Sequence, residues 1–357
     1  MTGSEFARLY GNKPYSVWEA AALAAARNGD MTPRTWVPIT VQDGDNKATL
    51  LVSNDYFGIG PVSDSLRLPL TPSIGQGILN LEGALYPTPL LDYRIWQQSP
   101  LKLSRTSIAA LDKRGNLGAN MGQYVEHSAL ADRQIAGIFA ATPNVQRRGD
   151  ELVSGHKKDI VVSNLLLPKK VVIHGWYAPP PAPDVYDDKS PWESPNRQPQ
   201  QVHSNAHGDF YVDYSHGIRA VHPMATVNGQ VMRTEDLYRH PVLSRMVSLE
   251  GPLKVVRYPS SVPVGGPGGQ TAADPADPTA SAPVVGPTVL PQIPSYPDFV
   301  LSQLSPAGIG AQSYSTLPEG HPLRVQYAAH VGTQLLLAAG VPMDVVMGSR
   351  GRDRRDR

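Results

Sequence analysis

Prolines gather in two stretches of this chain, and their positions limit how much of it can fold as one packed unit. Residues 259–297 contain ten prolines and the run GGPGG, and residues 178–201 contain seven prolines. Proline fixes its own φ and lacks an N–H, so neither stretch can form a long helix or a central strand. The pattern predicts a main domain over residues 1–258, a proline- and glycine-rich linker over 259–297, and a small helical tail with a basic, disordered end over 298–357.

Composition excludes several classes of function. The chain has 357 residues, 41% of them hydrophobic, and a net charge of only +1. A net charge this small produces no electrostatic field that would attract nucleic acid or an anionic membrane, so we expect neither as a partner. The chain has no cysteine, which excludes disulfides, thiolate metal sites and a cysteine nucleophile. The N-terminus lacks the pattern of a secretory signal and no apolar run is long enough to span a membrane. We therefore expect a soluble protein, cytoplasmic or virion-associated; its oligomeric state stays open.

Local patterns over residues 1–258 predict an α+β fold, with N-terminal helices packed on a mixed, largely antiparallel sheet. Capping residues and proline at helix starts predict four helices in the first half, and Asp43-Gly44-Asp45-Asn46 and Asn228-Gly229 predict hairpin turns. The expected helices are 17–28, 72–81, 89–96 and 120–139. The expected strands include 36–41, 48–53, the run from Asp159, 208–214, 225–232 and 253–258.

The stretch from His203 to His222 contains four of the ten histidines. If 208–214 is a strand, its side chains alternate between two faces. His207 and Asp213 then share one face, and Phe210 belongs to the apolar face that covers the core. Gly217 favours a bend that would bring His216 to the polar face. The sequence therefore places candidate chemistry on this stretch, although hydrogen-bonded surface histidines would produce the same pattern.

Three kinds of site fit these residues. His207, Asp213 and His216 have the ligand types of an open zinc site, so zinc is a possible cofactor. Ser215 is a candidate nucleophile, for which His207 or His174 would be the base, but there is no G-x-S-x-G elbow. Carboxylate acid–base chemistry by Asp213 is the third kind.

That third kind needs partners from neighbouring strands. Lys158, in the run His156-Lys157-Lys158-Asp159, and His174 lie within about sixty residues of Asp213 and could converge with it if their strands are neighbours. Asp209 and Asp213 would be roughly 13 Å apart on an extended strand, too far for a glycosidase pair. No phosphate-binding glycine motif is present.

Several segments resemble an uncharacterised family of bacterial and phage-associated proteins with no established activity. They are GHKKDIVVSN (155–164), VVIHGW (171–176) and HGDFYVDYSHGIRAV (207–221), with SNDYFGIGP (53–61) and LRLPLTPSIGQGILNLEGALYPTPLLDYRIW (66–96) upstream. The resemblance covers residues 4–258 and implies an intact domain; it assigns no functional residue.

Two functions follow as hypotheses. The first is a hydrolase that acts on a cell-wall or other extracellular polymer, with His207, Asp213 and His216 at its centre and His174, Lys158 or Ser215 assisting. The polymer is suggested by the setting of the family, not by any residue. The alternative is a non-catalytic structural or binding protein, such as a virion or surface component, which the low charge and the proline-rich linker favour.

Overall fold

The computed structural model describes residues 1–108, 120–142, 149–178 and 199–265. They belong to one compact unit. Most of the predicted linker and the whole predicted tail lie outside the described residues. The described part combines helices with mixed sheets, which confirms the α+β prediction. Among the described helices, none is long and apolar enough to cross a membrane.

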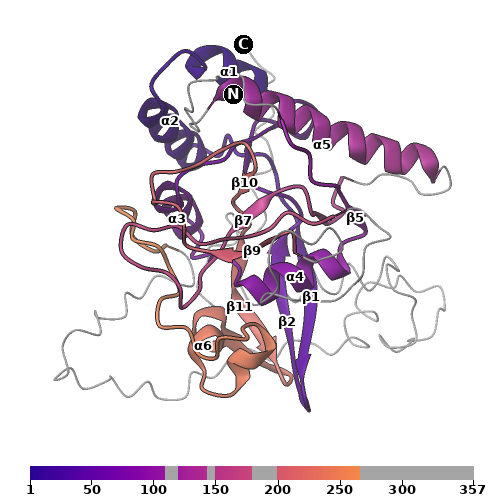
Figure 1. The fold of residues 1–357 in the computed structure, drawn as a ribbon, viewed down its shortest axis with the longest axis vertical. Coiled ribbons are helices and arrows are strands. Elements are labelled where there is room, and N and C mark those ends of the chain that lie inside the picture. The colour runs from indigo at the N-terminus through magenta and orange to yellow at the C-terminus, as the bar shows by residue number, and fades with distance from the viewer. Residues whose placement is uncertain (109–119, 143–148, 179–198, 266–357) are drawn as a thin grey trace, which may run out of the picture. The chain divides into compact units, whose positions relative to one another are not determined.

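Three of the described helices begin at side-chain caps. Thr2 forms a capping box with Glu5 at the first helix, and Thr88 and Asn120 accept hydrogen bonds from the first turns of two others. The helices are α1 (Gly3–Tyr10), α2 (Tyr15–Arg27), α3 (Pro72–Asn80), α4 (Pro89–Gln98), α5 (Met121–Ala141) and α6 (Thr234–Arg239), with short 3₁₀ turns η1 (Val62–Asp64) and η2 (Leu243–Met246). Figure 1 shows α1 and α2 at the opposite end of the unit from α6.

The larger sheet joins two hairpins that are far apart in the sequence. Its antiparallel order is β1 (Trp36–Asp43), β2 (Asn46–Ser53), β11 (Val221–Val227) and β12 (Gln230–Arg233). Both predicted turns are confirmed, with Gly44 at φ +55° and Asn228 at φ +50°. Ile39, Leu50 and Val221 are fully buried and belong to the main core, so this sheet supports the unit.

The second four-stranded sheet is short and places the candidate residues. Its order is β10 (His216–Gly217), β7 (Lys158–Ile160), β8 (Ile173–Gly175) and β9 (Gln201–Ser204), with β10 parallel to β7 and the other pairs antiparallel. Two smaller sheets pair β3 (Gly58–Ile59) with β4 (Leu66–Arg67), and β5 (Leu101–Lys102) with β6 (Val153–Ser154). β7 thus lies between β10, from much later in the chain, and β8.

The prediction of a strand at 208–214 is wrong. The segment is a loop held by local hydrogen bonds, among them Tyr211 N to the Gly208 carbonyl at 3.0 Å and His216 N to the Asp213 carbonyl at 3.1 Å. Phe210, expected in the core, is 79% exposed, although Val212 is buried. Turn-forming side chains therefore override the alternating pattern here.

Two further strand predictions need correction. No strand forms at 253–258, and the run from Asp159 forms only the three residues of β7. The packed chain also continues past the predicted boundary at residue 258. Val262 is 5% exposed, its carbonyl accepts from Asn80 Nδ2 at 2.7 Å, and Gly265 N donates to the Asn80 carbonyl at 2.7 Å. The first residues assigned to the linker are therefore part of the main unit.

Candidate functional site

Pairing of β10 with β7 sorts the candidate side chains into two groups. His216 lies opposite Lys158 in the parallel pair, and Asp159 lies opposite His174 in the antiparallel pair of β7 with β8. Because neighbouring strand residues point to opposite faces, Lys158 is half-buried beside one group and Asp159 is fully buried in the other. Because Gly217 has no side chain, the Tyr56 ring can pack directly against β10: a β-carbon at residue 217 would lie 2.6 Å from that ring.

The first group surrounds a carboxylate, and we call it the Asp213 cluster: Lys158, His207, Tyr211, Asp213, Ser215 and His216. Asp213 Oδ1 accepts from the Ser215 backbone at 2.8 Å and from the Ser215 hydroxyl at 2.5 Å, and Oδ2 accepts from the Tyr211 hydroxyl at 3.0 Å. The Tyr211 ring stacks on His207, with centroids 4.0 Å apart, and meets His216 edge-on at 5.6 Å. The loop thus gathers predicted residues that a strand was expected to align.

Asp213 is the charged centre of the cluster. Its burial favours a raised pKa. His216, which is protonated at the acid pH where Asp213 titrates, Lys158 and the hydrogen bonds from Ser215 outweigh burial and hold the pKa of Asp213 well below its usual range. Burial lowers the pKa of Lys158, and Asp213 partly offsets that effect. The Lys158 ammonium lies 4.4 Å from the centroid of the Trp176 ring, a cation–π arrangement that positions it.

His216 has both ring nitrogens buried without a hydrogen-bond partner. Burial lowers its pKa to about 4, with Asp213 opposing the shift, so the imidazole is neutral at pH 7. A buried polar atom without a partner costs about 1–3 kcal/mol, so a fold rarely retains one without a reason. Neutral His216 is therefore ready to accept a proton beside a carboxylate and an ammonium.

Ser215 has a supporting position. Its hydroxyl donates to Asp213, a carboxylate whose pKa lies well below its usual range, so Ser215 lacks the basic partner that a nucleophile needs. His174 also differs from its prediction, because it lies outside the Asp213 cluster: its Nδ1 is 2.6 Å from Asp92 Oδ2, and the side chain is fully buried.

The zinc prediction finds no support. Within the described ranges, which include His207, Asp213 and His216, no group of three or more histidine and carboxylate side chains is arranged to hold a metal ion. Asp213 already accepts three hydrogen bonds from Tyr211 and Ser215, and the Lys158 ammonium is close enough to lower its pKa. This donor set suits acid–base chemistry better than metal binding.

The second group, the Asp92 network, lies at the buried face of the same strands and consists of Tyr56, Asp92, Asp159, His174, Tyr177 and Arg219. Tyr177 donates to Asp92 Oδ2 at 2.9 Å, and Arg219 Nε is 3.5 Å from Asp159 Oδ2. Burial raises the pKa of Asp92 to about 7, and burial together with the charge of Asp92 raises that of Asp159. Gly175, at φ +112°, lets the chain pass closely over Asp92.

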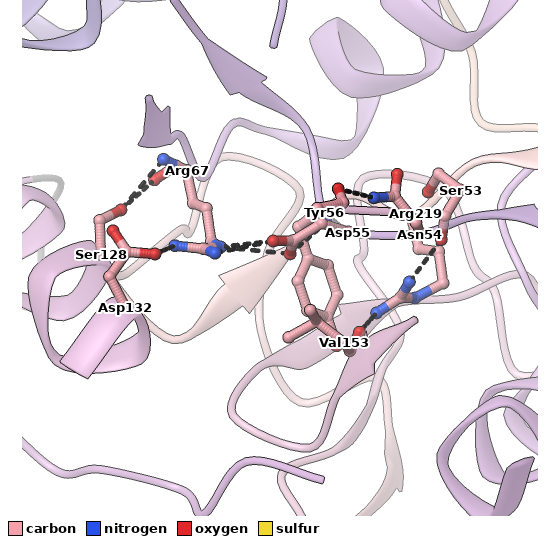
Figure 2. Close-up of polar contacts among 10 residues, drawn as sticks. Ser53, Asn54, Asp55, Tyr56, Arg67, Ser128, Asp132, Val153 and Arg219 are labelled. Carbon is pink, nitrogen blue, oxygen red and sulfur yellow. Dashed lines mark hydrogen bonds and ion pairs between the residues drawn. The ribbon is translucent and has the colours of Figure 1, made fainter. Parts of the chain in front are cut away.

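Two buried arginines tie segments of the unit together, Arg219 from the Asp92 network and Arg67 through Asp55 and Asp132 (Figure 2). Arg219 donates to the carbonyls of Ser53 and Val153, both at 2.7 Å, and its guanidinium lies 4.2 Å from the Tyr56 ring centroid. Arg67 bonds to Asp55 through two nitrogens, with Nη2 2.7 Å from Oδ2, and to Asp132 of α5 at 2.9 Å. Their carbonyl and carboxylate partners account for both charges, which indicates a structural role.

Sequence reasoning missed Tyr211 as an organising residue and missed Asp92 altogether. Asp92 comes from α4, 82 residues before its partner His174, and nothing in its local pattern distinguishes it from a solvated helix residue. Lys157, noted beside Lys158, is 1% exposed and donates to the Tyr214 carbonyl at 2.6 Å. Only tertiary contacts reveal these roles.

Lys157→Met is expected to remove most of a pH dependence of the folding free energy. Burial lowers the pKa of Lys157 from 10.5 to about 7. Between those pH values the unfolded chain binds a proton that the folded chain does not, so stability rises with pH across this window by on the order of 4 kcal/mol. Urea unfolding from pH 6 to pH 10 should show this rise in the wild type and in exposed Lys254→Met, and only a smaller rise, due to Lys158, in Lys157→Met. A rise of wild-type size in Lys157→Met would place the titrating group elsewhere.

Comparisons with protein-family models, with curated proteins and with solved structures find no match to this chain. The resemblance inferred from the sequence therefore stays a prediction. Function has to be argued from the Asp213 cluster itself.

Proposed function

We propose that the protein is a hydrolase whose acid–base centre is the Asp213 cluster. The observation that supports this most is neutral His216, with two unpartnered ring nitrogens, beside ionised Asp213 and the Lys158 ammonium. Perturbed titratable groups of opposite charge that gather at a partly open site are typical of active sites. Asp213, Tyr211, His207 and Lys158 are only partly buried, so the cluster reaches solvent on one side.

Each group has a role in the proposed reaction. His216 takes a proton from the attacking water while the oxygen attacks the scissile centre, and it then delivers that proton to the leaving group. Asp213 stabilises the imidazolium formed in between. Lys158 stabilises negative charge that develops on the substrate oxygen, because it is a cation in a water-poor setting. Ser215 and Tyr211 orient Asp213 through their hydrogen bonds.

The proposed substrate is a cell-wall or other extracellular polymer. The full chain would be incubated with purified peptidoglycan and with a panel of insoluble polysaccharides, and release of reducing ends and of free amino groups would be followed separately. The first readout reports cleavage between sugars and the second reports cleavage of amide bonds. His216→Gln should lose turnover, whereas His240→Gln, remote on the chain, should keep it. Turnover by His216→Gln at the wild-type rate would exclude this mechanism.

The rate should have a characteristic pH dependence. His216 must be neutral, so the rate should rise as pH increases through about 4, the value to which burial lowers its pKa. Lys158 must be charged, so the rate should fall at alkaline pH, below the ordinary lysine value of 10.5, because burial lowers its pKa. A steady-state profile of kcat/KM against pH checks both limbs. An acidic limb near the ordinary histidine pKa, 6.5, would remove His216 from the mechanism.

A non-catalytic structural or binding protein is the second candidate. It is favoured by the arginine contacts, since Arg67 and Arg219 use their buried charges to tie distant segments of the chain together. Under this hypothesis the Asp213 cluster would also be structural: the wild type would cleave no polymer, and substitution of the polar residues of the cluster would reduce stability.

A further inference from the structure

An exposed aromatic ring lies three residues before Asp213. Phe210 is 79% exposed, more than any other large hydrophobic side chain in the described residues. Burying a phenylalanine side chain contributes about 1.5–3 kcal/mol, so a ligand that covered this ring could gain free energy on that scale. Three residues span at most about 11 Å, so Phe210 lies within about two sugar units of Asp213.

The Phe210 ring has a fixed support. It lies against Gly208, where a β-carbon would come within 2.6 Å of ring atom Cε1. The loop is tied to the chain before β8, because Gly208 forms a bridge with Lys170 and Asp209 N donates to the Lys169 carbonyl at 3.1 Å. A side chain held in this way loses little conformational entropy when a ligand packs on it.

Polar and aromatic groups alternate along this loop. The stacked pair of His207 and Tyr211 flanks Gly208 and Phe210 in the sequence, and Tyr211 leads through its hydroxyl to Asp213. A pyranose ring has an apolar C–H face that packs on an aromatic ring and a rim of hydroxyls that bond to carboxylates and ammonium groups. An apolar peptide or a lipid would fit the ring but would offer no hydroxyls to the partly exposed polar side chains of His207, Tyr211 and Lys158.

We propose that Phe210 is a platform on which a sugar ring of a glycan stacks, placing the next linkage toward the Asp213 cluster. This deepens the proposed function, on which it rests for the role of Asp213, by naming the substrate class as a polysaccharide. Because the ring is exposed on the surface, the affinity for a single sugar should be weak. Oligosaccharides should bind more tightly than monosaccharides, because they also reach the polar groups.

Binding is tested separately from turnover. Chitotetraose, cellotetraose and maltotetraose would be titrated into the full-length protein by isothermal calorimetry, in the wild type and in the Asp213→Asn background. At least one tetrasaccharide should bind, and Phe210→Ala should weaken that binding about fivefold to tenfold, the size expected for loss of one stacked ring. Phe210→Tyr should bind as the wild type does. Leu249→Ala, at a residue 68% exposed, is the matched control and should leave binding unchanged.

The outcomes separate the two proposals. Saturable binding that depends on Phe210, without hydrolysis by the wild type, supports the platform and overturns the hydrolase. Hydrolysis of a polymer together with no binding of any tetrasaccharide, or with equal binding by Phe210→Ala, overturns the platform and leaves the hydrolase standing. Release of amino groups but not reducing ends, with no dependence on Phe210, also overturns the platform.

Discussion

Asp213→Asn should lower kcat at least about 100-fold while leaving the protein folded, because a charged partner of the proton acceptor contributes on this scale. Asparagine keeps an oxygen that can accept both Ser215 hydrogen bonds, and the Tyr211 hydroxyl can reverse its direction to accept from the new amide. The negative charge disappears, so the imidazolium of His216 loses its stabilising neighbour. Steady-state kinetics on the polymer that the wild type cleaves would measure this loss.

The matched control for that variant is Asp209→Asn. Asp209 lies in the same loop and is half-buried, but it is absent from the groups that shift the pKa of His216, Asp213 or Lys158. The Asp209→Asn variant should keep the wild-type kcat. Circular dichroism and urea unfolding would show that both variants fold. If Asp213→Asn turns over at the wild-type rate, Asp213 has no part in the reaction and the proposed mechanism is overturned.

Arg219→Met should lower the free energy of unfolding by about 3–5 kcal/mol, because removal of one partner leaves buried groups unpaired. Arg219 is fully buried and joins β2, β6 and β7 through Ser53, Val153 and Asp159. Methionine fills similar space but leaves both carbonyls without donors and Asp159 without its cation. Urea unfolding at pH 7 measures the change.

Arg239→Met provides the control for the loss of an arginine. Arg239 is 44% exposed and pairs with Glu235 at 3.0 Å along α6, an arrangement worth about 0.3–0.5 kcal/mol. Arg219→Lys, which keeps the charge but cannot reach both carbonyls, should fall between the two. A loss below about 1 kcal/mol in Arg219→Met would show that the network relaxes and that Arg219 does not tie the sheets together.

Much of the fold could be predicted because its determinants are local. Caps at Thr88 and Asn120 and turn residues at Gly44 and Asn228 act within a few positions, so α2 to α5 and both hairpins are recognisable in the sequence, although α1 was missed. The way the short strands β7, β8 and β10 pair has no comparable local determinant. They exist because separate segments pair around buried charges, which a single sequence does not reveal.

The sequence predicted which residues form the candidate site but not how they are arranged. Alternation placed His207 and Asp213 together on a strand face, yet the turn at Asp213, closed by the Ser215 backbone, brings them together in a loop. Phe210, the residue that distinguishes the two interpretations, points to solvent. His174 was placed on the correct neighbouring strand, but its contact is with Asp92 on the buried side.

The central claim is that His216 is a neutral proton acceptor electrostatically coupled to Asp213. Nitrogen NMR of histidine-labelled protein, with His216→Gln used to assign the signal, would follow the His216 ring through a pH titration. A pKa near 4 is expected, and a still lower pKa in Asp213→Asn, because the carboxylate favours the charged imidazole. A pKa near 6.5, or one that Asp213→Asn leaves unchanged, would contradict the account.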